Sequence, residues 1–399
     1  MYDTDIMFYP RYILPQLEKE LETPESIVIT GMRQVGKTTL LNHLFSLVES
    51  PNKIMLDFEN PLNRKIFEEE SYDAIWNNLA VFGVNNQTKA YIFLDEIQHL
   101  PSIGSVVKYL KDHFDVKFVL TGSSSYYIKN LFPESMAGRK FIFEIYPLTF
   151  SEFLTFRGIT RNTTPTFSEK AVLKNNIMYS KLISFYQEYL EYGGFPKVVL
   201  EKDRERKKAM LSEIFTSYYE NDIKSLADFK DTNKLRDLIL LLIPRVGSRI
   251  EVAKLASSLG VSRQTVYSYL SFLEKTYFIS LISRFSGSID RQAAGTQKLF
   301  LCDVGMVNNL GKASEGQLLE QSVFQSLRLD HKLHFYNKEG KSEIDFVVDE
   351  KIALEVKTSA SKRDIDHLRR RSKGISLSEA YVISKEYSEE REVILPTDL

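Results

Sequence analysis

The chain has 399 residues, 43% of them hydrophobic and 26% charged, which predicts a globular protein of about two to four domains. Its formal net charge of −1 at pH 7 excludes a whole-chain electrostatic attraction to nucleic acid or to an anionic membrane. The single cysteine, Cys302, excludes an internal disulfide, and the longest apolar run, 238–243, is too short to cross a bilayer. We therefore expect a cytoplasmic protein without membrane contact.

The first third of the chain alternates short apolar strands with helical or irregular segments. Residues 27–30 predict a buried strand, and a helical pattern covers 39–45 after a glycine-rich loop. Further strands are predicted at 53–57, 90–95, 117–121 and 141–145. This alternation indicates an α/β fold with a parallel sheet and crossover helices.

The glycine-rich loop has the pattern Gly-x4-Gly-Lys-Thr between a strand and a helix, as a phosphate-binding loop requires. Glycines let backbone N–H groups curl around phosphate oxygens, Lys37 brings charge to the β- and γ-phosphates, and the Thr38 hydroxyl coordinates Mg²⁺. ATP and Mg²⁺ are therefore the expected cofactors. The loop residues predicted to bind them are Gly31, Arg33, Gln34, Val35, Gly36, Lys37, Thr38 and Thr39.

Two carboxylates, Asp95 and Glu96, follow the predicted strand at 90–95. In a P-loop ATPase, Asp95 would hold Mg²⁺ through water and Glu96 would polarise the attacking water. The alternative is a strand end with two solvated acids. The sequence contains no Asn-Lys-x-Asp motif for guanine, so ATP is favoured over GTP. Together with Lys37, this pair predicts an ATPase.

Small hydroxyls and one arginine follow the next strand. Thr121 and Ser123 would lie beside the γ-phosphate, and we favour Ser123 as the polar sensor, with ordinary loop hydroxyls as the alternative. Arg139 precedes the fifth strand. It could stabilise transition-state charge in cis or across the interface of a homo-oligomer, or it could form a surface ion pair.

Six motifs stand in a fixed order along the chain. They are Gly31–Thr39, Phe93–Gln98, Thr121–Ser125, Ser135–Arg139, Tyr146–Phe153 and Gly193–Pro196. With them, the chain closely resembles the archaeal and bacterial AAA+-type P-loop ATPases that carry a C-terminal domain of unknown function. The family's acidic run after the second strand is kept only in part, as Met55–Glu59, which leaves a role for Asp57 or Glu59 open.

The resemblance implies ATP binding and four domains. They are an AAA+ ATPase core with a parallel sheet over 1–156, a helical lid over 157–240, a winged helix-turn-helix over 241–290, and a C-terminal α/β domain over 291–399 that resembles the PD-(D/E)xK, restriction-endonuclease-like fold.

Residues 250–274 predict a helix-turn-helix. Gly260 permits the turn and Ser262 is a good N-cap for the second helix. The first turn of that helix would expose Arg263, Gln264 and Tyr267, which could reach phosphates or base edges. DNA is the expected partner, and a protein contact is the alternative.

A possible nuclease centre lies in the C-terminal region. In PD-(D/E)xK enzymes, an Asp and a Glu from adjacent strands ligate Mg²⁺, a Lys positions the hydrolytic water, and a Glu on a helix completes the site. The matching metal ligands are Glu320, Asp345 and Glu355, and Asp345, Glu355 and Lys357 would be catalytic. The strands would form a hairpin that turns at 349–350. An inactive remnant of the fold is the alternative.

Basic residues follow on a predicted helix and could lie against a phosphate backbone, unless the helix is simply a solvated charged one. They are Lys362, Arg363, Arg369, Arg370 and Arg371. Two functional hypotheses remain open. The first is an ATP-driven protein that binds and processes DNA. The second is a nucleotide-dependent switch whose inactive C-terminal domain binds protein or DNA.

Overall fold

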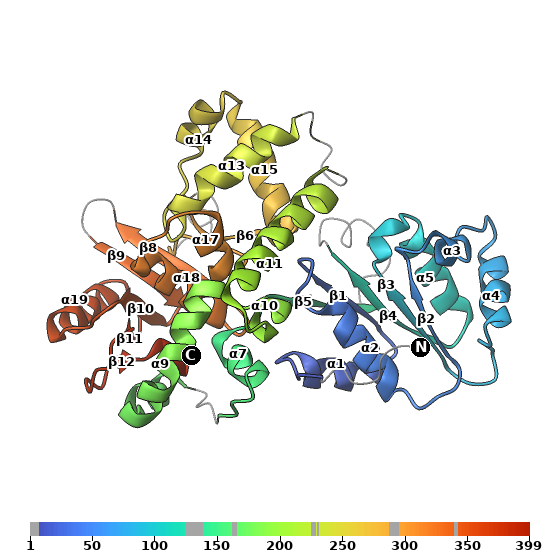
Figure 1. Ribbon diagram of the computed structural model, residues 1–399, viewed down its shortest axis with the longest axis horizontal. Helices are drawn as coiled ribbons and strands as arrows, with labels where there is room; N and C mark the ends of the chain where they lie inside the picture. Colours follow the sequence, from blue (N-terminus) through green and yellow to red (C-terminus); the bar gives the residue numbers. More distant parts are fainter. Residues whose placement is uncertain are drawn as a thin grey trace. The chain divides into compact units, whose positions relative to one another are not determined.

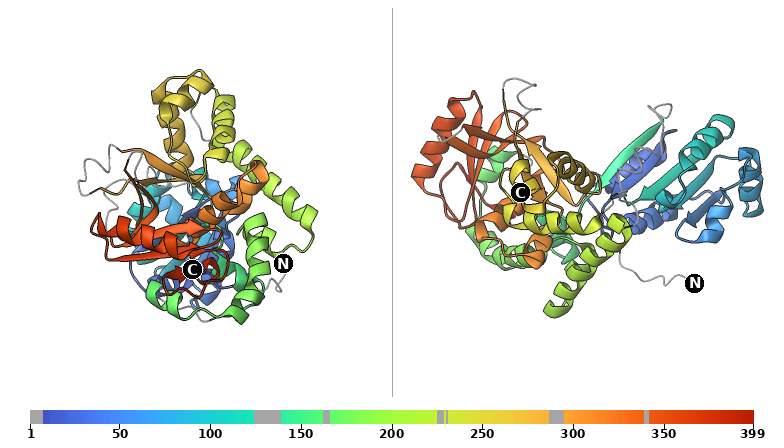
Figure 2. Two further views of the ribbon diagram at one scale, coloured as in Figure 1. Left: turned by 90° about the vertical axis from the view of Figure 1, so that its left-hand side faces the viewer. Right: turned by 90° about the horizontal axis from the view of Figure 1, so that it is seen from above.

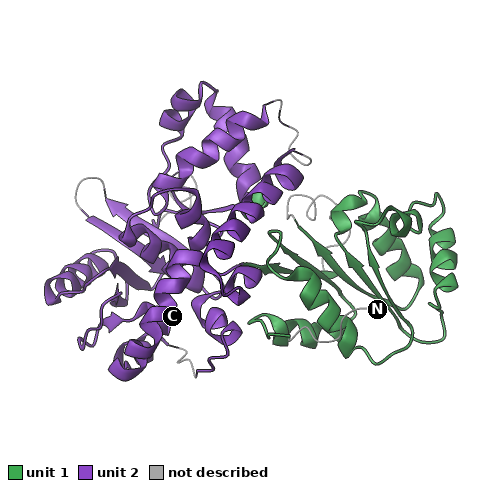
Figure 3. Ribbon diagram, viewed as in Figure 1, with its two compact units in different colours: residues 1–146, 275–277 green, residues 147–274, 278–399 purple. Residues whose placement is uncertain are grey.

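The computed structural model describes residues 8–123, 139–161, 166–224, 229, 231–286, 295–338 and 342–399. The chain divides into two compact units (Figure 3). The first unit contains residues 1–146 together with 275–277, and the second contains 147–274 and 278–399. Thus the segments expected to form the lid, the winged helix-turn-helix and the C-terminal domain lie largely in one unit, and the finer division into domains stays a prediction.

The first unit has a five-stranded parallel sheet in the order β2-β3-β4-β1-β5 (Figure 1). Its strands are β1 (Ser26–Gly31), β2 (Lys53–Asp57), β3 (Ala90–Asp95), β4 (Val116–Gly122) and β5 (Lys140–Ile145). Its helices are α1 (Leu14–Leu21), α2 (Lys37–Leu47), α3 (Pro61–Lys65), α4 (Tyr72–Val81), η1 (Ile97–His99) and α5 (Ile103–His113). The parallel sheet and all five predicted strands are confirmed.

Helices cover both faces of this sheet, which explains why its strands are continuous apolar runs. On one face, α4 and α5 share a hydrophobic core with β2, β3 and β4. On the other, Phe45 of α2 meets Phe93 of β3 with ring centroids 5.2 Å apart. The edge strand β5 is less covered, and Phe141 is 42% exposed. All the carboxyl ends of the strands meet at one edge, next to the start of α2.

The second unit is mainly helical before residue 330. Its helices there are α7 (Phe150–Phe156), α8 (Phe167–Val172), α9 (Asn176–Tyr192), α10 (Pro196–Leu200), α11 (Arg204–Ser217), η3 (Tyr218–Ile223), α13 (Thr232–Leu242), η4 (Ile243–Arg245), α14 (Val252–Leu259), α15 (Arg263–Lys275), α17 (Val304–Leu310) and α18 (Glu315–Leu327). The predicted helix-turn-helix is confirmed as α14 and α15. Gly260 has φ 66° at the turn, and Ser262 Oγ accepts a hydrogen bond from Thr265 N at 3.0 Å.

A buried carboxylate holds the middle of this unit together. Asp303 accepts hydrogen bonds from Gly194 N at 2.8 Å and from Gln325 Nε2 at 3.1 Å. A Cβ at Gly193 would lie 1.8 Å from Asp303 Oδ1, so only glycine fits there. The glycine pair after α9 is therefore a packing requirement that joins α9 to α17 and α18.

The C-terminal part of the second unit is a mixed sheet between two helices. Its strands run in the order β12-β11-β10-β9-β8, and α18 and α19 pack on opposite faces (Figures 1 and 2). The remaining elements of the unit are β6 (Ile279–Ser283), β7 (Gln297–Leu301), β8 (Leu333–Lys338), β9 (Ser342–Val348), β10 (Ile352–Lys357), α19 (Lys362–Lys373), β11 (Glu379–Ser384), β12 (Val393–Ile394) and η5 (Pro396–Asp398). The predicted hairpin is confirmed, since β9 and β10 pair antiparallel and Asp349 and Glu350 form the turn with φ 51° and 60°. In the part of the chain that the structure describes, no helix is long and apolar enough to cross a membrane.

Candidate nucleotide-binding site

The predicted phosphate loop joins β1 to α2 and is fixed at both ends. A Cβ at Gly31 would lie 2.1 Å from the Ile145 carbonyl oxygen, so the strand end requires glycine. Gly36 is the N-cap of α2 and has φ 100°, in the left-handed region that favours glycine. Between them, Val35 O accepts a hydrogen bond from Nη1 of the buried Arg11 at 2.7 Å, while Nη2 of the same guanidinium binds Tyr146 O at 2.7 Å.

Lys37 and Thr38 open α2 at the carboxyl edge of the sheet. The buried Lys37 Nζ donates to the carbonyl oxygens of Gly31 and Met32, at 3.0 Å each. Thr38 Oγ1 donates to Asp95 Oδ2 at 2.7 Å. The lysine ammonium is therefore held by carbonyls at the start of the loop, and the Thr38 hydroxyl contacts the first carboxylate of the acidic pair.

Asp95 is buried at the end of β3, between two threonine hydroxyls. Thr121 Oγ1 donates to its Oδ1, opposite the contact from Thr38. Burial raises the pKa of Asp95, and the charges of Glu96 and Asp57 act in the same direction, whereas the two threonine hydrogen bonds lower it. A carboxylate in this setting is stabilised by an added cation, because a cation would offset the desolvation and the two neighbouring charges.

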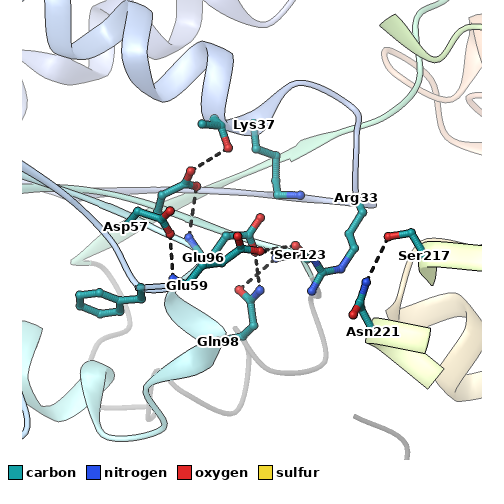
Figure 4. A network of polar contacts seen from close by, with 12 residues as sticks. Arg33, Lys37, Asp57, Glu59, Glu96, Gln98, Ser123, Ser217 and Asn221 are labelled. Atoms are coloured by element: carbon teal, nitrogen blue, oxygen red, sulfur yellow. Dashed lines mark hydrogen bonds and ion pairs between the residues drawn. The ribbon is translucent and has the colours of Figure 1, made fainter. Parts of the chain in front are cut away.

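Glu96 adopts the left-handed conformation with φ 53°, which is rare for a residue with a side chain and common at functional sites. Its Oε2 accepts hydrogen bonds from Ser123 Oγ at 2.7 Å and from Gln98 Nε2 (Figure 4). Burial would raise the pKa of Glu96, but Lys37, Gln98 and Ser123 outweigh it, so this pKa lies below its usual range. Glu96 is thus held ionised and oriented.

Gln98 closes this network, because its Oε1 accepts a hydrogen bond from Ser123 N at 3.2 Å. Sequence reasoning missed Gln98 and also missed Arg11 under the loop. Of the two hydroxyls weighed from the sequence, Ser123 contacts Glu96 and Thr121 contacts Asp95. Gln98 lies two residues beyond Glu96. This short spacing within a turn was the sequence feature that could have predicted a contact between the two side chains.

Other charged residues lie around this edge or away from it. Arg33 lies 3.8 Å from Glu59, whose backbone N–H donates to Asp57 Oδ1 at 2.8 Å (Figure 4). Arg139 lies at the amino end of β5, where its carbonyl pairs with Ser26 N and its guanidinium pairs with Asp112. The structure therefore places Arg139 at the sheet edge opposite the phosphate loop, in the surface ion pair that was the alternative to a catalytic role.

In the second unit, the structure brings Glu320 and Asp345 to the ammonium of Lys298. Lys298 is 1% exposed, forms an ion pair with Glu320, and lies 3.6 Å from Asp345 Oδ1. Burial alone would lower the pKa of Lys298. The two carboxylates raise this pKa by more than burial lowers it, so the pKa lies above its usual value. Asp345 Oδ2 also accepts from Val356 N at 2.8 Å. Sequence reasoning missed Lys298.

Glu355 is held separately from these two acids. Its Oε1 lies 2.9 Å from Lys357 Nζ, and its Oε2 pairs with Arg371. Glu355 and Lys357 thus form an ion pair, and Arg371, expected to face a phosphate backbone, binds a carboxylate as well. Among the described residues, no three Asp, Glu, His or Cys side chains are grouped so that they could hold a metal ion. The predicted nuclease centre stays a prediction.

Comparison with family models places the nucleotide site in a known type of domain. Residues 23–154 match a model described as an AAA domain. This match and the five-stranded parallel sheet support a P-loop ATPase. Residues 183–317 and 315–396 match two further models, each described as a domain of unknown function.

Matches to related proteins and to solved structures cover most of the chain. A protein of Methanocaldococcus jannaschii, named only as uncharacterised, is 28% identical over 333 residues, covering 80% of this chain and 71% of its own. A second such protein, from Haemophilus influenzae, is 28% identical over 349 residues, covering 84% and 82%. Cdc6p of Pyrobaculum aerophilum has a TM-score of 0.30 at 13% identity, covering 80% of this chain and 97% of its own. AMPPCP-bound DnaA of Aquifex aeolicus has a TM-score of 0.27 at 15% identity, covering 66% and 86%. Scores this low do not establish a shared overall fold.

Proposed function

We propose that the first unit binds ATP with Mg²⁺ and hydrolyses it. The observation that carries this proposal is the contact between Thr38 Oγ1 and Asp95 Oδ2 at the mouth of the phosphate loop, directly beside Glu96. A hydroxyl and a carboxylate are the oxygen donors that Mg²⁺ accepts from proteins, so the residues fit the metal. When bound, Mg²⁺ would supply positive charge to the phosphates. Lys37 would bind the β- and γ-phosphates in place of the two carbonyls.

In this proposal Glu96 acts as the base that orients and deprotonates the attacking water. A base must be ionised and fixed in direction. The Lys37 charge and the hydrogen bonds from Ser123 and Gln98 favour ionisation, and both hydrogen bonds also limit side-chain rotation. Ser123 would serve as the sensor, because the hydroxyl that holds Glu96 directly follows β4, the strand that pairs with β1 before the phosphate loop.

The test is Glu96→Gln, measured as ATP turnover and as binding of a fluorescent ATP analogue with Mg²⁺. Turnover should fall by about 10²–10⁴-fold, the usual contribution of general base catalysis, while analogue binding stays within a few-fold of wild type. Glu68→Gln, on the exposed surface of the same unit, should change neither. Wild-type turnover in Glu96→Gln would remove Glu96 as the base.

We also propose that α15 of the second unit binds duplex DNA, with nucleotide hydrolysis coupled to this binding. Two features support a winged helix-turn-helix. The buried side chains Val266, Leu270 and Leu273 leave Arg263, Gln264 and Tyr267 outside, with Tyr267 55% exposed. After α15, β6 and β7 pair antiparallel, and residue 249 adds a bridge to β7.

Coupling can be measured as ATP turnover with and without linear, single-stranded and junction DNA. We expect duplex DNA to change the rate, and Arg263→Ala to remove the response. Arg236→Ala on α13 is the matched control, since Arg236 is also exposed and its neighbour is Asp237. If no DNA changes the rate, the alternative of a nucleotide-dependent switch that binds protein is favoured.

A role of Arg139 across a homo-oligomer interface would be detected as ATP turnover per enzyme molecule that rises with protein concentration.

A further inference from the structure

A cationic pocket lies between α19 and the start of β9. Its volume is about 340 Å³, and its lining residues are Ser342, His367, Arg370 and Arg371. None of these four side chains is acidic. Because one hydroxyl, one imidazole and two guanidinium groups face the same space, the pocket presents hydrogen-bond donors and positive charge to any ligand.

Helical spacing explains why three of these residues meet. His367, Arg370 and Arg371 are at positions i, i+3 and i+4 of α19, so they share one face of the helix. The other side of α19 packs through Ile365 and Leu368 on the core of the sheet. Hydrophobic packing of the helix therefore holds the cationic face beside the start of β9.

Arg371 forms the rigid wall of the pocket. Its guanidinium donates to the carbonyls of His367, at 3.3 Å, and of Glu343, and it pairs with the Glu355 carboxylate. Glu355 is shared with Lys357, so one carboxylate pairs with two cations. A fixed guanidinium lowers the entropy lost when a ligand binds.

Arg370 is the second guanidinium of the pocket and has no carboxylate partner within ion-pair distance in the described parts of the chain. Its Nε donates to the Asp366 carbonyl at 3.2 Å, which leaves the rest of the guanidinium for a ligand. Arg369, one residue earlier, differs because it pairs with both Asp366 and Glu392. Of these two neighbouring arginines, Arg369 is therefore paired with carboxylates and, within the described ranges, Arg370 is not.

The positive charge continues beyond the pocket. Helix α19 carries six Lys or Arg residues against two Asp. Lys338 stands directly opposite Ser342 in the pairing of β8 and β9 and is exposed. Lys362, Arg363 and Lys373 are exposed on the same helix. Several exposed cations on the helix that carries the pocket suit a polyanion better than a single small anion.

We propose that this pocket binds a phosphodiester group of a nucleic-acid backbone, with Arg370 and His367 donating to the phosphate oxygens. The proposal rests on the proposed DNA binding and gives it a second contact site, on α19 in addition to α15. Contacts of this kind position a protein on nucleic acid without reading its sequence. The pocket should therefore raise affinity for any duplex to a similar extent.

The test uses the full chain and a fluorescein-labelled 20-base-pair duplex, with binding measured by anisotropy over a range of salt concentrations. Each phosphate contact contributes about 0.9 to the slope of log affinity against log salt. Arg370→Ala should lower that slope by about one and weaken binding about three- to tenfold near 0.1 M salt. Arg370→Lys should restore most of the slope. Arg369→Ala should leave it unchanged, because the Arg369 charge is already paired.

Several outcomes would overturn the assignment. An unchanged slope in Arg370→Ala, with normal circular dichroism, would show that the pocket touches no backbone phosphate. If calorimetry finds inorganic phosphate bound at Arg370 while the slope does not move, the ligand is a free anion instead. If Arg263→Ala removes duplex binding and Arg370→Ala changes neither the affinity nor the slope, the pocket fails and the α15 site stands. If the wild type binds no duplex, both fail, while the ATPase proposal is judged separately by turnover.

Discussion

The two units hold their acidic clusters in opposite ways. In the first unit, Asp95 and Glu96 accept hydrogen bonds from hydroxyl and amide groups, and within the described residues neither has a Lys or Arg at ion-pair distance. In the second unit, Glu320 and Asp345 share the ammonium of Lys298. Neutral donors orient a carboxylate and leave its charge in place, whereas a buried cation neutralises it.

The buried lysines show the same contrast. Lys117 of β4 donates to the backbone carbonyls of Glu20, Thr23 and Glu25, and burial lowers its pKa to about 8. Lys298 has two carboxylate partners, and its pKa is raised. The identity of the partner therefore decides the direction of the shift. From this comparison we infer that the first acidic cluster can attract an external cation, while the second is already satisfied by an internal one.

The largest expected effect is at Lys37. Lys37→Ala removes the one ammonium under the phosphate loop, and ATP turnover should fall by about a thousandfold, near the upper end for the loss of one preorganised donor. Lys65→Ala, on the exposed surface of α3, should turn over ATP normally. Equal ATP turnover in Lys37→Ala and Lys65→Ala would contradict the proposed nucleotide site, and the contrast drawn between the two acidic clusters would then fail.

The next effect concerns Lys298. Lys298→Met leaves the partly buried Glu320 and Asp345 without their buried cation, and the second unit should lose about 3 kcal/mol of unfolding free energy. The single cysteine, Cys302, is buried in this unit, so the rate of thiol labelling measures its opening. Lys254→Met breaks only the exposed pair with Glu251 and should cost about 0.5 kcal/mol or less. Equal labelling rates in the two variants would contradict an essential role for Lys298.

Gln98 gives a smaller effect, on orientation. Gln98→Ala removes the amide that holds Glu96, so kcat should fall about tenfold while KM stays nearly constant. Steady-state kinetics with Gln87→Ala as the exposed control would check this. Because Gln98→Asn keeps the amide on a shorter side chain, it should recover part of the rate. A change confined to KM would show that Gln98 acts in binding and does not position the base.

The smallest effect is the pH dependence of Lys117. Its folded pKa of about 8 is below the unfolded value of about 10.4, so the stability from the neutral amine is present above about 10.4 and is lost as pH falls through 8. The unfolding free energy of wild type should therefore rise between pH 8 and 10, and by about 1 kcal/mol more than that of Lys117→Met. The single tryptophan, Trp76, lies in the first unit and reports its unfolding. Parallel pH profiles in the two proteins would contradict the shift.

Local patterns predicted much of this fold. The five strands of the first sheet could be located because helices cover both faces of the sheet, which makes its inner strands continuous apolar runs. The contact of Thr38 with Asp95 was predictable too, since both stand where neighbouring elements reach the same sheet edge. The hairpin of β9 and β10 followed from its alternation and its acidic turn.

The choice of side-chain partner could not be predicted in the same way. Lys298 is one residue in the short strand β7, and the sequence around it does not predict its ion pair with Glu320 on α18. Likewise, Gln98 folds back on Glu96 only because Glu96 adopts positive φ. Arg371 was expected to face a phosphate, and the packing of α19 also brings it to Glu355, a contact that the sequence did not indicate. These contacts depend on tertiary placement, which local periodicity does not encode.

The first unit is discontinuous, and this affects the order in which it can be completed. Tyr277 belongs to it although it follows α15 in the chain, and its hydroxyl donates to Glu144 Oε1 at 3.2 Å while its ring meets Tyr146 edge to face. During synthesis, these contacts at the end of β5 can therefore form only after α15 and Tyr277 have been translated. A fragment that stops at residue 146 would retain the phosphate loop but lack this late closing contact.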